Sequence, residues 1–360
     1  KKINKVTVIG SGIMGSRIAC HFANIGVEVL LLDIVPKSEN ALEAKKGLST
    51  KDKIVRNRIV NEAFKNTLKS KPSPIYTKEF INRIQTGNIE DDLHKISQYD
   101  WIIEVIIENI EIKKQLFKQI EKYRKPGTII SSNTSGIPIN NMISDQSEDF
   151  CQHFCGTHFF NPPRYLKLLE IIPSKKTNPN VISFLMSYGE KFLGKTTVLC
   201  KDTPAFIANR IGIAGIASLF KLSEKLNLSV EEIDILTGPI IGRPKSATFR
   251  TSDLVGLDTL NSVADGVYNN CTDDEQRNIF NLPSFIKTML TNKWLGDKTK
   301  QGFYKKDKDA RGNRKILALN LKNLEYYEKK KPKFKTLAKA KKENQLSKRL
   351  NILIEGTDKA

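Results

Sequence analysis

The sequence contains few of the residues that build metal sites, disulfide frameworks or membrane spans. No run of 18 apolar residues occurs anywhere in its 360 residues, so no segment has the composition of a transmembrane helix. The five cysteines are an odd number and form no Cys-x-x-Cys pair, and two of them, Cys20 and Cys200, lie in apolar runs that we expect to be buried. We therefore predict a reduced, cytoplasmic protein without a structural metal site.

Acidic residues are also scarce relative to basic ones, and the imbalance is concentrated at one end. Residues 305–360 hold 18 Lys or Arg against 7 Asp or Glu, a net of +11, which leaves +9 of the total of +20 for the rest of the chain. This tail lacks the Gly and aromatic interleaving of RNA-binding segments. We expect a solvated tail or linker and no nucleic-acid partner. The modest basic excess elsewhere suits an anionic small substrate.

The most informative pattern that is present lies near the start of the chain. Residues 5–9 form a short β-branched stretch typical of a buried strand, and residues 10–15 read Gly-Ser-Gly-Ile-Met-Gly. Helical apolar spacing follows, and then a second strand-like stretch, residues 28–33. That stretch ends in Asp33, which is 18 positions past Gly15. The order strand, glycine turn, helix, strand and acidic residue is typical of dinucleotide binding.

Each glycine of this turn has a separate physical task. Gly10 permits the tight turn, Gly12 allows a pyrophosphate to approach the backbone, and Gly15 lets the helix lie close to the strand. The helix N-terminus offers free N–H groups to the phosphates. Asp33 can accept hydrogen bonds from both ribose hydroxyls of NAD and would repel the 2′-phosphate of NADP. The pattern predicts NAD as the cofactor, and the alternative is a purely structural turn in an α/β sheet.

The remaining periodicity predicts an α/β protein with a Rossmann-type doubly wound sheet followed by an all-helical C-terminal domain. Strands and helices alternate over residues 1–200, which we assign to an NAD-binding domain. Residues 201–304 are helical and form the predicted substrate and dimerisation domain, with residues 305–360 as the basic tail. We expect Asp202 or Thr203 to cap the first helix of the second domain and Ser229 to begin a capping box.

One histidine of the four in the chain stands out by its surroundings. His158 lies in a short apolar strand, and Glu170 lies in the next apolar run, 12 residues on, after a turn at Pro162 and Pro163. Antiparallel pairing of the two runs would bring these side chains together. A buried carboxylate fixes the tautomer of an imidazole and makes it a better base. Spacing alone leaves a structural His–Glu pair as the alternative, and no further ligand at suitable spacing supports a metal site.

Four strings together identify a family. They are residues 10–15, residues 132–135 (Ser-Asn-Thr-Ser), residues 156–162 (Gly-Thr-His-Phe-Phe-Asn-Pro) and residues 202–210. In their order and spacing the chain resembles the L-3-hydroxyacyl-CoA dehydrogenases of fatty-acid β-oxidation. Residues 241–246 and 294–304 look like a branch in which the dehydrogenase precedes an enoyl-CoA hydratase on one multifunctional polypeptide. The basic tail would then be the linker toward that second enzyme.

The resemblance implies a role for each residue that matches the family motifs. His158 is the implied catalytic base, Glu170 orients it, and Ser135 and Asn209 contact the substrate. Without the resemblance, Ser135 reads as an ordinary helix cap and Asn209 as an ordinary surface amide. The activity implied is NAD-dependent oxidation of (S)-3-hydroxyacyl-CoA to 3-oxoacyl-CoA. The cofactor residues implied are Gly10, Gly12, Ile13, Met14, Gly15, Asp33, Glu108, Lys113 and Asn133.

The charged insertion between Asp33 and Tyr99 corresponds to a helical region that contacts CoA in relatives. Ser49, Lys53 and Arg56 are the candidates there by charge and position, with a solvated Lys-rich helix as the alternative. The expected partners are an acyl-CoA substrate and either a second copy of the chain or the attached hydratase domain. Broad apolar stripes in the helical region favour such a covered surface. They comprise Phe206, Ile207, Ile211, Ala214, Ile216, Leu219 and Phe220.

Two other functions share the predicted architecture. A β-hydroxyacid dehydrogenase of the 6-phosphogluconate type would use a catalytic lysine, whereas this chain offers His158 and Glu170. A non-catalytic NAD-binding relative, such as a lens-type crystallin of this family, would not need the intact set of Ser135, His158, Glu170 and Asn209.

Overall fold

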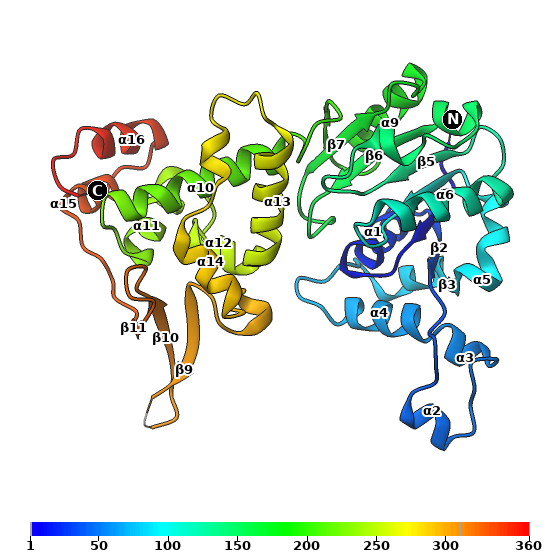
Figure 1. Cartoon of the computed structure of the whole chain (residues 1–360), viewed down its shortest axis with the longest axis horizontal. Helices are drawn as coiled ribbons and strands as arrows, with labels where there is room; N and C mark the ends of the chain where they lie inside the picture. Colours follow the sequence, from blue (N-terminus) through cyan, green and yellow to red (C-terminus); the bar gives the residue numbers. More distant parts are fainter. Residues whose placement is uncertain (1, 310, 360) are drawn as a thin grey trace. The chain divides into compact units, whose positions relative to one another are not determined.

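The computed structural model describes residues 2–309 and 311–359, and the chain divides into two compact units, Lys1–Phe206 and Ile207–Ala360 (Figure 1). Each unit is described by itself below. Among the described residues, no helix combines the length and the apolar character that crossing a bilayer requires.

The first unit is built on an eight-stranded sheet in the order β3-β2-β1-β4-β5-β6-β7-β8. Neighbouring strands run parallel except β6 and β7, which pair antiparallel. The order reverses direction at β1, whose neighbours are β2 and β4, and this switch point is where doubly wound sheets bind their ligands. The strands are β1 (Lys5–Ile9), β2 (Glu28–Asp33), β3 (Ile84–Asn88), β4 (Trp101–Glu104), β5 (Ile129–Ser132), β6 (Phe154–Phe159), β7 (Leu168–Pro173) and β8 (Thr196–Leu199).

Helices cover both faces of this sheet (Figure 1). One core contains apolar residues of α1, α4 and α9, and the other contains residues of α6, α7 and α8. The predicted doubly wound architecture is therefore confirmed. The helices are α1 (Ile13–Asn24), α2 (Ala41–Lys45), α3 (Lys53–Arg56), α4 (Arg58–Leu68), α5 (Ile89–Asp92), α6 (Ile110–Tyr123), α7 (Ile139–Met142), α8 (Glu148–Gln152) and α9 (Pro179–Lys191).

The second unit consists of helices followed by a small sheet and two further helices. Its core contains a cluster of aromatic rings from Phe220, Phe249, Phe285 and Phe303, with centroid separations of 4.6–6.3 Å. The predicted capping box at Ser229 is present. The helices are α10 (Ala208–Lys225), α11 (Val230–Leu236), α12 (Phe249–Val255), α13 (Leu257–Asn270), α14 (Ser284–Thr291), α15 (Lys335–Ala340) and α16 (Leu346–Ile354), and the strands are β9 (Tyr304–Lys308), β10 (Arg314–Leu319) and β11 (Tyr326–Glu328).

The prediction for the start of the first helix of this unit is wrong. α10 begins at Ala208, after Ala205 and Phe206 adopt left-handed φ values of 61° and 51°. Asp202 is used elsewhere: its carboxylate accepts hydrogen bonds from the backbone N–H groups of Ile139 and Asn140 at 2.8 and 3.0 Å. It thus supplies acceptors to the first turn of α7, in the first unit.

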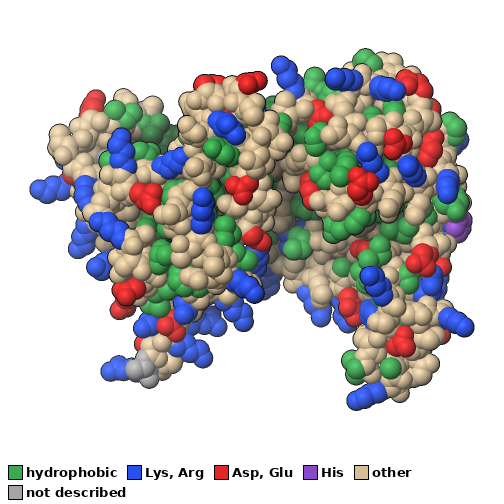
Figure 2. All heavy atoms as spheres, in the orientation of Figure 1, with side chains coloured by type: hydrophobic (Ala, Val, Ile, Leu, Met, Phe, Trp, Pro, Cys, Tyr) green, Lys and Arg blue, Asp and Glu red, His purple; other side chains and the backbone are tan. Residues whose placement is uncertain are grey.

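The prediction of a solvated tail over residues 305–360 is also wrong, because most of that segment is folded. β9, β10 and β11 form an antiparallel sheet, and Figure 2 shows Lys and Arg side chains over β9 and β10. Phe334, Leu337 and Ala340 are buried and pack in one cluster with Ile240. Because they are spaced three residues apart, their side chains lie on one face of α15 and of the residue that precedes it. Few apolar residues are therefore enough, because each of them lies on the buried face.

We expect Leu337→Ala to destabilise the second unit by about 2–5 kcal/mol, the usual cost of truncating a buried leucine. Leu337 is 2% exposed in the cluster that joins the tail to Ile240. Lys339→Ala, on the exposed side of the same helix, is the matched control and should change stability by at most about 0.5 kcal/mol. Urea unfolding of both variants measures the difference. Equal stabilities of the two variants would show that the tail does not contribute to the stability of the unit. Because the tail supplies buried residues to this cluster, deletion of residues 311–360 should also be destabilising.

Candidate cofactor and active site

The candidate site lies at one edge of the sheet of the first unit. β1, β2, β4, β5 and β6 run parallel, so their carboxyl ends meet at the same edge. The glycine turn follows β1, Asp33 ends β2, and Glu104 ends β4. Ser135 follows β5, and His158 is the penultimate residue of β6. The fold therefore gathers at this edge residues that are far apart in the sequence.

The three glycines of the turn differ in what surrounds them. Gly10 has a φ of +103°, and a Cβ there would lie 2.4 Å from the carbonyl oxygen of Val105. A Cβ at Gly15 would lie 1.8 Å from the carbonyl oxygen of Gly10, so helix α1 could not approach the turn. At Gly12 a Cβ would have no neighbour within 4 Å, and it would point into open space at the N-terminus of α1. This arrangement fits a pyrophosphate held over Gly12 by backbone N–H groups.

Asp33 is tied directly to this turn. One of its carboxylate oxygens, Oδ2, accepts hydrogen bonds from the Ser11 N–H at 2.7 Å and from the Ser11 hydroxyl at 2.5 Å. The carboxylate is half-buried at the end of β2. Beside it, Ile13 is 67% exposed and Met14 is half-buried. A carboxylate at this place is positioned to accept from ribose hydroxyls.

A buried ion-pair network extends from the end of β4. The Lys113 ammonium lies 2.6 Å from Glu104 and 3.3 Å from Glu108, and Ser132 donates to Glu104 at 2.5 Å. Burial raises the pKa of Glu104. The pKa of Glu108, in contrast, is lowered overall. Burial acts to raise this pKa, but the Lys113 ammonium and hydrogen bonds from residues 134 and 135 lower it by more. Glu108 is thus held as a carboxylate at the site.

This network positions the segment after β5. Glu108 accepts hydrogen bonds from the Thr134 hydroxyl at 2.6 Å and from the backbone N–H of Ser135 at 2.8 Å. Asn133 accepts from the backbone N–H of Phe159 at 2.9 Å, and so links the end of β5 to the strand that carries His158. Ser135 itself is half-buried, and its hydroxyl lies 3.3 Å from Glu108.

The structure brings His158 and Glu170 together as the spacing predicts. They are direct partners in the antiparallel pairing of β6 and β7, and Nδ1 of His158 lies 2.7 Å from Oε2 of Glu170. His158 is 6% exposed and Glu170 is fully buried. Because a carboxylate accepts, Nδ1 carries the hydrogen of a neutral imidazole, and Nε2 is left as the acceptor. The pair therefore has the geometry of a base held in one tautomer.

Two aromatic rings lie beside this imidazole, and a buried lysine contacts the loop that follows β6. The rings of Phe160 and Phe206 lie 4.4 and 5.8 Å from it, centroid to centroid. Lys195 is buried, and its ammonium donates to the carbonyl groups of Pro163 and, at 2.7 Å, Leu166. Lys195 therefore stabilises the loop that joins β6 to β7. No short-range pattern marks Lys195, since its partners are about 30 residues away in the sequence.

The candidates in the charged insertion have different surroundings. Arg56 is already paired with Glu90 and Asp91, each at 2.7 Å. The Ser49 hydroxyl lies 3.1 Å from Asp52. Lys53 is exposed at the first residue of α3. Lys53 is thus more available than Arg56 for an anionic ligand.

Asn209 belongs to the second unit. It is half-buried in the first turn of α10. A side-chain amide there can donate and accept hydrogen bonds, and the N-terminal turn of a helix provides a favourable field for a polar or anionic group.

Comparison with known proteins adds independent evidence. The family model described as the NAD binding domain of 3-hydroxyacyl-CoA dehydrogenase matches residues 5–203, and the one described as its C-terminal domain matches residues 206–306. The NAD-binding assignment of the first unit is therefore supported over nearly all of its length.

Individual relatives carry related names. A probable 3-hydroxyacyl-CoA dehydrogenase of Bacillus subtilis is 48% identical over 360 residues, which cover 100% of this chain but 45% of that protein. A probable 3-hydroxyacyl-CoA dehydrogenase of Deinococcus radiodurans is 44% identical and covers 86% of this chain and 85% of its own length. Among solved structures, an (S)-3-hydroxybutyryl-CoA dehydrogenase from Ralstonia eutropha has a TM-score of 0.66 at 26% identity, covering 84% of this chain and 98% of its own.

Proposed function

The chain belongs to the 3-hydroxyacyl-CoA dehydrogenase family, and on that premise we propose that it oxidises (S)-3-hydroxyacyl-CoA to 3-oxoacyl-CoA with NAD, as part of fatty-acid β-oxidation. The observation that carries the proposal is the buried His158–Glu170 pair at 2.7 Å, on the same sheet edge as the glycine turn and Asp33.

In this proposal the chain's own residues move the proton of the reaction. Nε2 of His158 takes the proton of the C3 hydroxyl as the C3–O bond becomes a carbonyl. NAD, which the glycine turn and Asp33 would hold, would supply the acceptor for the C3 hydride. Glu170, hydrogen-bonded at Nδ1, stabilises the imidazolium that forms and is a positioning residue. In the direction of reduction the imidazolium returns its proton to the C3 oxygen.

The remaining site residues would bind and orient the substrate. We assign the Ser135 hydroxyl to the C3 oxygen and the Asn209 amide to the region of the thioester. Glu108 fixes the backbone of Ser135 and so sets the position of that hydroxyl. In the insertion, Ser49 and Lys53 are proposed contacts for CoA, and Arg56 contributes less because its charge is paired with Glu90 and Asp91.

The proposal is tested by following NADH oxidation at 340 nm with acetoacetyl-CoA as substrate. Turnover of acetoacetyl-CoA is the expected result. Activity on free 3-hydroxy acids with none on the CoA thioester would instead identify another β-hydroxyacid dehydrogenase. Tight NADH binding without turnover of either substrate would identify a non-catalytic relative.

Cofactor choice gives a second expectation. Asp33→Ser should raise the ratio of kcat/KM for NADPH to that for NADH by at least about tenfold, because the variant no longer repels a 2′-phosphate or accepts from the ribose hydroxyls. Asp145→Ser, at an exposed carboxylate of the same unit, is the control with the same charge change. A parent chain that prefers NADPH would contradict the placement of Asp33 at the ribose.

We further propose that the chain is the dehydrogenase part of a longer polypeptide that continues into an enoyl-CoA hydratase. This chain spans 45% of the Bacillus subtilis relative, and 43% of a putative fatty acid oxidation complex trifunctional enzyme of Rickettsia prowazekii. A second copy or the attached domain would cover exposed apolar residues of α10, such as Ile211, which is 68% exposed. Light scattering of this chain should give a dimer if a second copy is the partner.

A further inference from the structure

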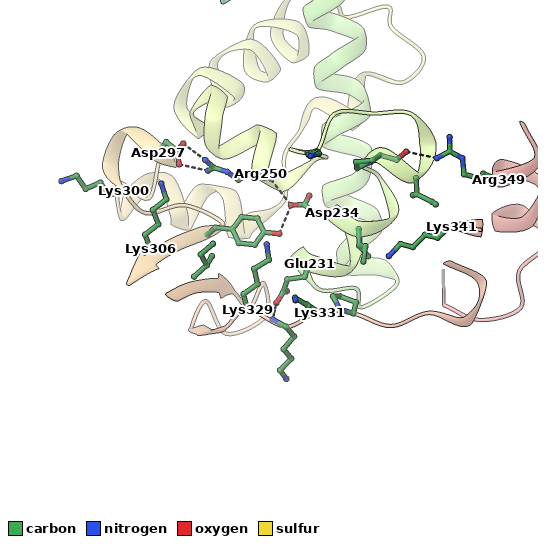
Figure 3. Close-up of a pocket in the computed structure, with 18 residues that line it drawn as sticks. Glu231, Asp234, Arg250, Asp297, Lys300, Lys306, Lys329, Lys331, Lys341 and Arg349 are labelled. Atoms are coloured by element: carbon green, nitrogen blue, oxygen red, sulfur yellow. Dashed lines mark hydrogen bonds and ion pairs between the residues drawn. The ribbon is translucent and has the colours of Figure 1, made fainter. Parts of the chain in front are cut away.

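The second unit contains a large cavity that the proposed dehydrogenase reaction does not use (Figure 3). Its volume is about 1040 Å³. α11 and the turn at Pro239 and Ile240 form its floor. Residues of β9 and β10 and the residues that follow β11 form one wall, and Lys341 and Arg349 reach it from the segment of α15 and α16. The cavity therefore exists only because the basic tail folds.

The charges around the cavity are strongly unbalanced. Nine Lys and Arg side chains line it, against three carboxylates, those of Glu231, Asp234 and Asp297. In Figure 3 the cationic side chains come from several segments and surround the hollow. Clustered like charges in a concave surface with low-dielectric walls create a potential that concentrates ions of the opposite sign.

Two of these carboxylates, those of Asp234 and Glu231, accept hydrogen bonds from neutral groups and form no ion pair with the cations among the described residues. Asp234 accepts hydrogen bonds from three consecutive backbone N–H groups, residues 248–250, at 2.7–3.1 Å, and from the Tyr304 hydroxyl at 2.7 Å. Glu231 accepts from the Tyr327 hydroxyl at 2.5 Å and from the backbone N–H of Lys330 at 3.0 Å. Glu231 thus holds the tail against α11, and Asp234 holds Tyr304, the first residue of β9.

Among the described residues, one of the nine cations has an acidic partner. Arg250 forms a bidentate pair with Asp297 at 2.6 and 2.7 Å and lies 4.0 Å from Asp253. Within residues 2–309 and 311–359, the other eight have no carboxylate within 4.0 Å. The Arg349 guanidinium donates to the Pro239 carbonyl at 3.4 Å, and its buried Nε has no hydrogen-bond partner. A buried donor without an acceptor is costly.

From this geometry we propose that the cavity is a binding site for a phosphorylated nucleotide, either a free nucleotide or the adenosine bisphosphate head of CoA. Several uncompensated cations on opposite walls suit a ligand with several phosphate charges. The apolar floor, formed by residues such as Ile235 and Ile240, suits a base and sugar. The volume is that of a typical small-ligand pocket.

The same features disfavour larger polyanions. A nucleic-acid duplex or a bilayer presents a broad surface, whereas these cations line a hollow. Single-stranded nucleic acid binds by stacking bases on open aromatic rings. Here the ring of Tyr304 has the Lys329 ammonium 4.7 Å from its centroid, and that of Tyr327 has Lys330 at 5.6 Å. These cations occupy faces on which a base could stack.

The test is isothermal titration calorimetry of the full chain saturated with NADH, which occupies the proposed NAD site of the first unit. The probes are ADP, adenosine 3′,5′-bisphosphate, inorganic tripolyphosphate, an oligonucleotide and poly-aspartate. The variant is Lys306→Gln combined with Lys341→Gln, two exposed cations from different walls of the cavity. The control is Lys225→Gln combined with Lys287→Gln, which removes the same charge from exposed helical positions of the unit outside the cavity.

We expect a nucleotide site that the cavity variant weakens by at least about tenfold and the control leaves unchanged, because two nearby charges are lost only in the former. Tighter binding of ADP assigns the site to a free nucleotide, and tighter binding of the bisphosphate assigns it to the CoA head. Four results would overturn the proposal: no binding, equal affinities of both double variants, tripolyphosphate as tight as the nucleotides, or an oligonucleotide or poly-aspartate bound more tightly. None of these readouts depends on dehydrogenase turnover.

Discussion

Replacing His158 with Gln should lower kcat for acetoacetyl-CoA reduction by at least about 10²–10⁴-fold, the usual contribution of a general acid–base group. Gln retains a polar side chain of similar length but cannot carry and return a proton at the position of Nε2. NADH binding should persist, because the glycine turn and Asp33 belong to the ends of β1 and β2, whereas His158 and Glu170 lie on β6 and β7. Steady-state kinetics and NADH fluorescence titration measure the two quantities.

His153→Gln is the matched control for this variant. His153 is a half-buried histidine of the same unit, and its Nδ1 lies 2.8 Å from the backbone carbonyl of Asp149, away from the candidate site residues. It should keep full activity. Glu170→Gln should lower kcat by at least about tenfold, since an amide cannot stabilise the imidazolium by charge. A His158→Gln enzyme with a third of the parent kcat would refute the assignment of the base.

The elements of the first unit were predictable where local patterns and buried surfaces agree. The β-branched run at residues 5–9 and the run at residues 28–33 are β1 and β2 with the predicted limits. Their apolar faces are the ones that the sheet buries, so tertiary packing reinforces the local preference. The position of α10 was not predictable in this way, because Asp202 binds α7 instead of capping its own helix.

The candidate site was predictable to the extent that it follows from strand pairing. A turn between two apolar runs places His158 opposite Glu170, so their contact follows from their spacing in the sequence. The Lys113–Glu104 pair is different, because it joins a helix to the end of a strand and depends on how α6 packs on the sheet. The cavity of the second unit was even less predictable from the sequence. Its acids and cations come from segments about 100 residues apart, and counting charges along residues 305–360 cannot distinguish them from a solvated tail.

The glycine turn allows folding and cofactor binding to be separated by two substitutions of the same kind. Gly15→Ala should destabilise the first unit by several kcal/mol, because its Cβ would lie 1.8 Å from the carbonyl oxygen of Gly10 and α1 would have to move away from β1. Gly12→Ala should leave the unit folded and as stable as the parent, since no atom lies within 4 Å of the added Cβ. Urea unfolding compares the two variants.

Cofactor binding should show a different pattern from stability. If the pyrophosphate lies over Gly12, the methyl group of Gly12→Ala occupies its space, and NADH affinity should fall by at least about tenfold in a fully folded protein. The control is Gly47→Ala, which replaces a glycine of the same unit outside the turn. Gly47 has a φ of +68° and open surroundings, and this variant should keep the parent NADH affinity. Fluorescence titration gives the affinities. Unchanged NADH binding in Gly12→Ala would place the phosphates elsewhere, and an unchanged stability of Gly15→Ala would mean that the close contact of α1 with the turn is not required.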